Sequence, residues 1–170
     1  PDEIVVIYRH PLDVFLSSMN YFYINNWKDK YRNGNIKTVE ALKESGELDY
    51  YFEQFLEEVG SGYFEGLLGD KSHYFNYLEH VRELPNVHVL KYESLFDGRN
   101  EFFDNFFSEL LQTKVTCSDS LFSDVDVKTK GSGERFYWKS RKKNYESFLS
   151  DSQVQLFNKK YQDELIRYGY

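Results

Sequence analysis

The sequence predicts an α/β fold, in which the strands of a parallel sheet alternate with helices. Two short runs of apolar, β-forming residues, 4–9 and 87–93, each continue directly into turn or helix signals. Between and after these runs, apolar residues recur at the three- and four-residue spacing of amphipathic helices. Because strands that alternate with helices usually run parallel, we expect both runs to belong to one parallel sheet.

The first half of the chain supplies a strand and several helices. Residues 4–9 are apolar on both faces, which is the pattern of a buried central strand. The next helix starts with Pro11, which suits a first helical position, and Asp13 lies in its first turn, where the helix dipole favours an acid. We expect this helix to reach about residue 24, followed by mostly loop over 25–46 with a helix near 39–43, and an acidic helix over 48–59.

The second half continues the alternation. A helix over about 71–84 ends before Pro85, and the second strand follows it. Ser150 and Gln153 form a capping box that starts the last helix. We also expect an apolar helix over 100–111 with core residues Phe102, Phe103, Phe106 and Phe107, a short helix within 118–127, and a loop over 128–144.

Length and composition indicate the domain organisation. The 170 residues suffice for one domain with a real core, and 19% of them are aromatic. No repeat or linker divides the chain, so we expect a single domain over residues 1–170. Two strands make a poor sheet by themselves, and Pro1 stands close to the first of them. We therefore expect the chain to be the C-terminal part of a longer protein.

Charge and cysteine content restrict the partners and the location. A net charge of -7 argues against nucleic acid or an anionic membrane as a partner. Cys117 is the single cysteine, so no internal disulfide forms, and the sequence has no Asn-x-Ser/Thr site; both features indicate a cytoplasmic protein. No apolar run approaches the length of a membrane span. Cys117 has no cationic neighbour that would lower its pKa, so we expect no catalytic thiol.

An arginine and a serine stand where a ligand is expected. Ligands of open parallel sheets bind at the carboxyl ends of strands, and Arg9 ends the first strand. Its guanidinium is a fixed cation whose forked donors suit phosphate. Ser17, two helical turns further on, offers a hydroxyl. In the alternative interpretation Arg9 pairs with an acid and Ser17 faces solvent, and the spacing alone leaves both open.

The stretch R-H-P-L-D-V-F-L-S, from Arg9 to Ser17, resembles the strand–helix motif that binds the 3′-phosphate in the PAPS-dependent sulfotransferases. PAPS is 3′-phosphoadenosine 5′-phosphosulfate, and the family's arginine and serine bind its 3′-phosphate. V-L-K-Y-E-S-L, residues 89–95, is similar to the strand whose tyrosine lies near the adenine, which maps to Tyr92. K-T-K-G-S-G-E-R-F-Y-W-K, residues 128–139, is similar to the late loop that closes over the 3′-phosphate, and the end of the chain resembles the family's capped C-terminal helix.

The late loop departs from the family pattern. Lys130 and Gly131 match the family's Lys-Gly pair. Thr129 stands where the family usually has an arginine. The resemblance then implies that Lys128 or Arg135 supplies the missing cation.

The resemblance implies a P-loop-like sulfotransferase fold and a reaction. A sulfuryl group would pass from PAPS to a hydroxyl or amine of a small-molecule or glycan acceptor, leaving 3′-phosphoadenosine 5′-phosphate (PAP), with no metal required. The family's Gly-rich lysine loop, which cradles the 5′-phosphosulfate, and its general-base histidine have no counterpart in the sequence. We therefore expect negligible turnover from this chain alone. The alternatives are a non-catalytic nucleotide-binding or scaffolding domain of the same fold, and a fragment of a small-molecule kinase.

Three further groups of residues carry hypotheses. Aromatic residues of the acidic region line the acceptor pocket in the family, and the candidates are Tyr50, Tyr51, Phe52, Phe55, Tyr63 and Phe64. A basic run either attracts the anionic donor, contacts an anionic acceptor or forms a solvated loop; it comprises Lys139, Arg141, Lys142 and Lys143. The histidines are expected in local, solvated or packing roles, and they are His10, His73, His80 and His88.

Overall fold

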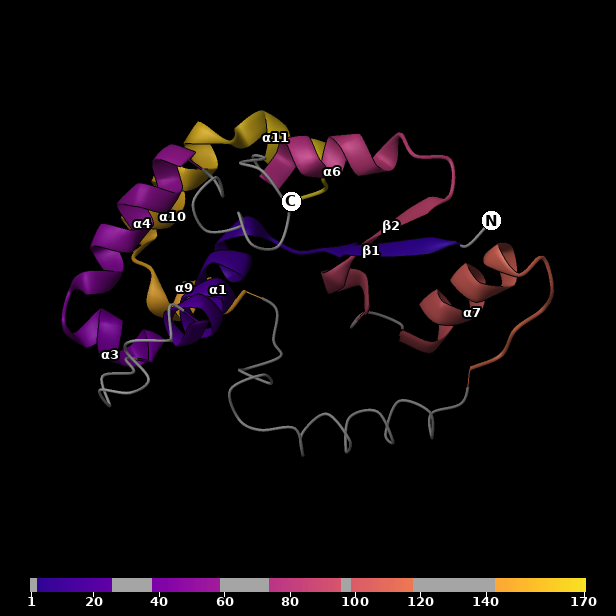
Figure 1. The fold of residues 1–170 in the computed structure, drawn as a ribbon, viewed down its shortest axis with the longest axis horizontal. Coiled ribbons are helices and arrows are strands. Elements are labelled where there is room, and N and C mark those ends of the chain that lie inside the picture. Colours follow the sequence, from indigo (N-terminus) through magenta and orange to yellow (C-terminus); the bar gives the residue numbers. More distant parts are fainter. Residues whose placement is uncertain (1–2, 26–37, 59–73, 96–98, 118–142) are drawn as a thin grey trace. The chain divides into compact units, whose positions relative to one another are not determined.

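The fold is known from a computed structural model, and most of the residues that it describes lie in helices (Figure 1). Within the described residues the sheet has two strands, which run parallel, so this part of the chain is α/β as the sequence predicts. None of the described helices has both the length and the apolar character needed to cross a membrane. The described residues are 3–25, 38–58, 74–95, 99–117 and 143–170.

The chain divides into two compact units, and each is described by itself. Unit 1 holds Pro1–Arg9 and Asn86–Ser140, and unit 2 holds His10–Pro85 and Arg141–Tyr170. The boundary therefore lies between Arg9 and His10, inside the first motif. A single domain over the whole chain stays a prediction.

Unit 1 contains the parallel sheet. Strands β1 (Ile4–Tyr8) and β2 (Val87–Lys91) confirm the two apolar runs seen in the sequence. The pairing is in register over all five residues, and Tyr8 at the end of β1 lies beside Lys91 at the end of β2. Both strands therefore reach their carboxyl ends at the same edge of the sheet.

A turn and a helix follow β2 within unit 1. The chain forms a 3-10 turn, η2 (Tyr92–Leu95), and then helix α7 (Arg99–Leu110), close to the helix that the sequence predicts over 100–111. His88 of β2 lies edge-on to the Phe106 ring of α7, with the ring centroids 5.8 Å apart. Its Nε2 atom is 2.9 Å from a carboxylate oxygen of Glu3. These contacts pack α7 and the start of the chain against the sheet.

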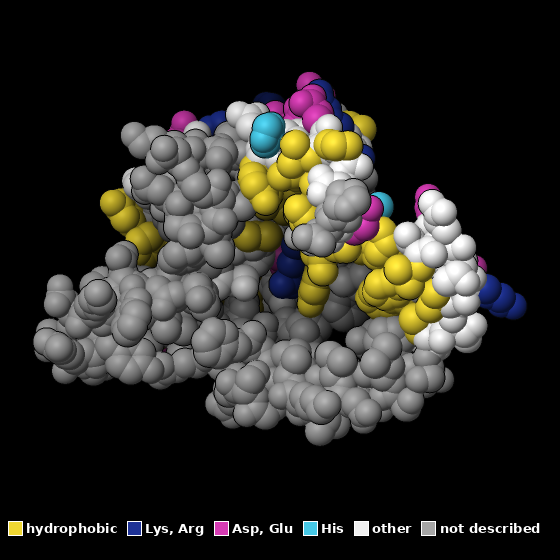
Figure 2. Space-filling view, turned by 45° about the vertical axis from the view of Figure 1, so that its right-hand side comes forward, with side chains coloured by type: hydrophobic (Ala, Val, Ile, Leu, Met, Phe, Trp, Pro, Cys, Tyr) yellow, Lys and Arg dark blue, Asp and Glu magenta, His cyan; other side chains and the backbone are white. Residues whose placement is uncertain are grey.

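The prediction that the first strand is buried on both faces is wrong. Ile4, Val5 and Ile7 are 48%, 42% and 54% exposed. The reason is that pairing with β2 satisfies the hydrogen bonds along one edge of β1 but does not cover its faces. A strand of a parallel sheet is buried only where other elements pack on both faces of the sheet. Figure 2 shows hydrophobic side chains reaching the surface in several patches. The expected core phenylalanines of α7 are half-buried rather than buried: Phe102, Phe103, Phe106 and Phe107.

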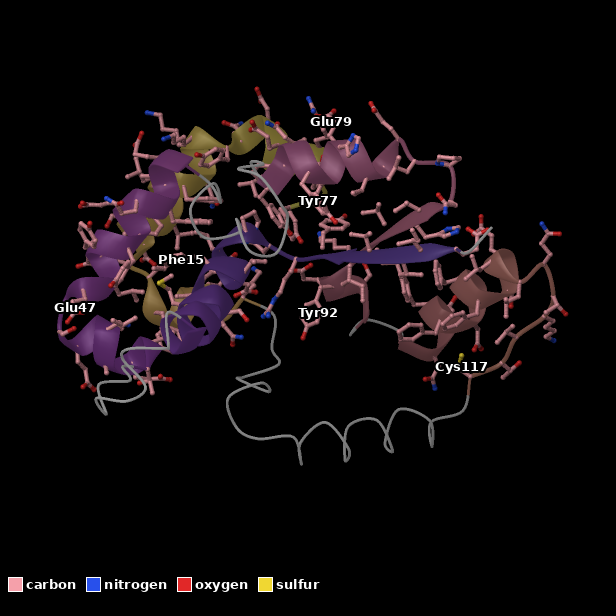
Figure 3. All side chains as sticks on the ribbon, in the orientation of Figure 1. Phe15, Glu47, Tyr77, Glu79, Tyr92 and Cys117 are labelled. Atoms are coloured by element: carbon pink, nitrogen blue, oxygen red, sulfur yellow. The ribbon has the colours of Figure 1, made fainter. Side chains whose placement is uncertain are left out.

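Unit 2 is a set of helices around an aromatic core. Phe15, Phe55 and Phe157 are each fully buried. The ring of Phe55 lies between the other two: it stacks on Phe15 at 4.8 Å between centroids and on Phe157 at 5.8 Å. Figure 3 labels Phe15. The helices in the described part of this unit are α1 (Pro11–Asn25), α3 (Val39–Glu44), α4 (Glu47–Glu58), α6 (Tyr74–Arg82), α9 (Tyr145–Phe148), α10 (Asp151–Lys160) and α11 (Gln162–Arg167).

The last helix has the predicted start but is interrupted. The Ser150 side chain accepts the Gln153 N–H, and the Gln153 side chain accepts the Ser150 N–H, which confirms the capping box. The single helix expected to follow is split at Tyr161 into α10 and α11. The Tyr161 hydroxyl donates a 2.7 Å hydrogen bond to the Leu56 carbonyl of α4, so the break lies where α10 is tied to a neighbouring helix.

Candidate functional site

The carboxyl ends of β1 and β2 bring two candidate residues together. Because Tyr8 lies beside Lys91, the next residues along the two strands, Arg9 and Tyr92, emerge at the same edge of the sheet. The Cζ atom of Arg9 lies 4.6 Å from the centroid of the Tyr92 ring, within the range of a cation–π interaction. Figure 3 labels Tyr92, which begins η2. One residue from each of two sequence motifs therefore contacts the other.

The surroundings of this pair favour a strong interaction. Both side chains are half-buried, and the Nε atom of Arg9 is buried. Partial removal from water strengthens the attraction between a guanidinium and an aromatic face. The sequence reasoning assigned Arg9 and Tyr92 to different parts of a nucleotide and missed their contact. The sequence did indicate this contact, because both residues directly follow strands that are expected in one parallel sheet.

Ser17 is the second residue of the first motif. It lies in the second turn of α1, and its side chain is exposed. The helix begins at Pro11, two residues after Arg9, so the strand passes into the helix almost without a loop, as the sequence predicts. Ser17 belongs to unit 2 and Arg9 to unit 1, and their joint binding of one phosphate stays a prediction.

The late-loop candidates lie outside the described residues, and their roles stay predictions: Lys128, Lys130, Gly131 and Arg135. Of the basic run, the structure describes Lys143. This lysine is exposed, and its Nζ atom lies 3.3 Å from a carboxylate oxygen of Glu146. The contact is the surface pairing expected of a solvated basic residue.

His10 caps the helix that carries Ser17. Its carbonyl accepts hydrogen bonds from the first turn of α1, and its Nδ1 atom accepts the Leu12 N–H at 3.2 Å. Because Nδ1 is the acceptor, the neutral ring carries its proton on Nε2. The imidazole is buried, stacks on Tyr145 at 4.6 Å and meets Tyr170 edge-on at 4.8 Å. These contacts give His10 the local role that the sequence indicates.

Asp13 is a structural residue whose importance the sequence reasoning missed. Its side chain is 1% exposed. One carboxylate oxygen accepts the N–H of Lys143 at 3.0 Å, and the other accepts the N–H of Tyr145 at 3.1 Å. Asp13 therefore ties the first turn of α1 to Lys143, at the end of the basic run, and to Tyr145, at the start of α9. Its position in the motif was a signal, but the partners are 130 and 132 residues away.

The aromatic residues of α4 do not act as one group. Phe52 and Phe55 are buried and pack against Phe15, so they belong to the core and are not acceptor contacts as proposed from the sequence. Tyr50 is 59% exposed, and its ring meets the half-buried Tyr51 ring at 5.5 Å. These two tyrosines remain candidates, and the other two, Tyr63 and Phe64, lie outside the described residues.

Cys117 has the surroundings of an unreactive thiol. Its pKa is raised first by desolvation and then by the hydrogen bond and negative charge of Asp104. A raised pKa leaves less of the nucleophilic thiolate near neutral pH. Among the histidines, His80 is exposed, and His73 lies outside the described residues. The described part of the chain contains no group of three or more His, Cys, Asp or Glu side chains that could hold a metal ion.

A scan against protein-family models finds no match for this chain, and a search of the curated proteins finds none either. The resemblance to the sulfotransferases therefore rests on the motifs in the sequence. The geometry of the strand ends is compatible with those motifs, since Arg9 and Tyr92 come together there. The sulfotransferase function is consequently put forward below as a proposal.

Proposed function

We propose that this chain binds the 3′-phosphate and adenine of PAPS in a sulfotransferase. The observation that carries the proposal is the contact between Arg9 and Tyr92 at the carboxyl ends of two parallel strands. Each residue comes from a different motif of the resemblance, and sheets of this kind bind ligands at this edge.

The chemistry of the residues fits a ribose phosphate. Arg9 supplies a permanent positive charge and forked N–H donors that match phosphate oxygens. Ser17, on an exposed part of α1, supplies a hydroxyl that donates to the same group in the proposal. Hydrogen bonds between charged groups contribute about 1.5–3 kcal/mol each, which is enough to select a 3′-phosphorylated nucleotide.

Sulfuryl transfer needs more than nucleotide recognition. Positioning of the donor and neutralisation of charge on the leaving phosphate account for most of the catalysis expected at such a site. The sequence holds no Gly-rich lysine motif for the 5′-phosphosulfate. We therefore propose that the chain binds PAPS and PAP but by itself transfers sulfuryl groups to a hydroxyl or amine acceptor at a negligible rate.

Calorimetric titration with PAP, adenosine 5′-monophosphate (AMP) and ATP tests the proposal. PAP is expected to bind most tightly, and Arg9→Ala is expected to weaken PAP about 10- to 100-fold while leaving AMP within about 2-fold. Arg82→Ala is the matched control, because Arg82 also stacks on a tyrosine, with its Cζ atom 5.4 Å from the Tyr168 ring centroid. That variant should bind all three nucleotides as the parent chain does.

Two results would overturn the proposed function. Failure of the parent chain to bind any of the nucleotides would indicate a scaffolding domain. A preference for ATP over PAP would indicate a kinase fragment. A normal rate of sulfuryl transfer by the isolated chain would contradict the expected lack of turnover.

A further inference from the structure

The contact between Arg9 and Tyr92 follows from the sheet rather than from the flexibility of the side chains. The five-residue register fixes where β1 and β2 end relative to each other. Tyr92 is the first residue of η2, so its backbone continues directly from the paired strand. The ring is thereby anchored at the level where the Arg9 side chain leaves β1.

A long arginine side chain benefits from such an anchor. Its rotatable bonds give it many conformations, and an anion would have to select one of them at a cost in entropy. A ring face at 4.6 Å restricts the guanidinium before a ligand arrives. The half-buried surroundings of both residues strengthen this restraint, because cation–π attraction grows as the cation loses water.

We infer that Tyr92 is a positioning residue, whose ring orients the Arg9 guanidinium and so makes the site selective for a 3′-phosphate. This inference rests on the proposed function. It gives Tyr92 a role different from the one that the resemblance implies, which is proximity to the adenine. Tyr92 acts on the phosphate through Arg9, so its loss reduces discrimination between nucleotides with and without the 3′-phosphate.

The two roles of Tyr92 predict different results with PAP and AMP, which differ only in the 3′-phosphate. If the ring only contacted the base, its removal would weaken both nucleotides equally and leave the ratio of their affinities unchanged. If the ring positions Arg9, its removal weakens PAP more than AMP and the ratio falls. The ratio therefore separates recognition of the base from positioning of the arginine.

The experiment measures both dissociation constants for three variants of the chain by calorimetry. Tyr92→Phe keeps the aromatic face and should keep the ratio within about 2-fold, whereas Tyr92→Leu should lower it by at least about 3-fold. Tyr92→Met fills similar space without an aromatic face and carries the same expectation as Tyr92→Leu, in case one of them fails to fold. Tyr77→Leu, which removes a half-buried tyrosine ring of α6, is the control and should leave the ratio unchanged.

A second background shows whether the effect passes through the arginine. The double variant Arg9→Ala/Tyr92→Leu should have the same ratio of PAP to AMP affinity as Arg9→Ala alone, because no guanidinium remains to be positioned. A further fall in this background would overturn the inference. A high ratio in the parent chain that survives both Tyr92→Leu and Tyr92→Met would overturn the positioning role alone. A parent ratio near one would overturn the proposed function and the inference with it.

Discussion

The two units differ in how they bury apolar side chains. Among the described residues, twenty-one hydrophobic side chains are buried and all of them belong to unit 2, Phe15, Phe55 and Phe157 included. In unit 1 every described side chain is half-buried or exposed, although its strands and α7 are rich in Ile, Val and Phe. A high apolar content therefore does not by itself produce a core. A core also requires enough layers to cover both faces of an element.

The largest expected effect compares one phenylalanine from each unit. Phe55→Ala removes a fully buried ring that stacks on two others, and should lower the free energy of unfolding by about 3–5 kcal/mol. Phe106→Ala removes a half-buried ring of unit 1 and should cost about 1 kcal/mol. Urea denaturation followed by circular dichroism measures both variants.

Equal losses for these two variants would contradict the comparison. They would mean that α7 is as well covered in solution as α4. Tyr50→Ala is a control on the same helix as Phe55, because its side chain is 59% exposed and should change the free energy of unfolding little.

The next effect concerns the buried carboxylate of unit 2. Asp13→Asn replaces one of two accepting oxygens by an NH₂ group that faces a backbone N–H, and should cost about 2 kcal/mol. The free energy of unfolding and the hydrogen-exchange rates of the Lys143 and Tyr145 amides measure the change, and both amides should exchange faster. Asp49→Asn is the matched control, because this exposed carboxylate accepts one bond, from Gln153, that an asparagine oxygen can still accept. Unchanged exchange at both amides in Asp13→Asn would show that the carboxylate does not hold them.

The smallest effect appears at alkaline pH. The pKa of Tyr168 is raised from 10.0 by desolvation and then by the charge of Glu79, while Arg82 and Arg167 partly oppose the shift. The folded state holds the phenolic proton more tightly than the unfolded state does, so the raised pKa contributes to the free energy of unfolding. This contribution to stability is fully present below pH 10.0 and is lost as the pH rises through the pKa of the folded state. Tyr168→Phe should make the alkaline fall in stability less steep, and unfolding from pH 8 to about 11 measures it.

Tyr168→Phe should also lower the free energy of unfolding slightly at every pH. The hydroxyl donates to the Phe75 carbonyl at 3.3 Å, so its loss should lower stability by about 1 kcal/mol at neutral pH. An alkaline slope identical to that of the parent chain would mean that other groups cause the fall. Tyr50→Phe, at an exposed ring, should leave both the level and the slope unchanged.

Local patterns predicted most of the secondary structure. Apolar spacing placed both strands and the helices α1, α4 and α7 within a few residues, and the capping box of α10 was read directly from Ser150 and Gln153. These features depend on neighbours within one or two turns of the chain. The break at Tyr161 was not predicted, because it coincides with a bond to Leu56, which is distant in sequence.

Burial and long-range contacts could not be predicted in the same way. The two apolar faces of β1 indicated a central strand, but apolar faces do not show which layers are present to cover them. The partners of Asp13 are backbone groups more than a hundred residues away, and a backbone N–H has no signature in a sequence. In the candidate site, the sequence identified Arg9, Ser17 and Tyr92 individually, and the register of the sheet was needed to bring Arg9 to Tyr92.

The pairing of only five residues on each strand has a consequence for recognising such sites in other chains. Side chains alternate between the two faces of a strand. An insertion of one residue near the start of β2 would therefore turn Tyr92 to the opposite face from Arg9, although both motifs would still be recognised in the sequence. Two proteins could then share both sequence motifs and differ in whether the tyrosine ring contacts the arginine guanidinium. The number of residues between each strand and its motif is thus a more demanding criterion for a homologue than the motif itself.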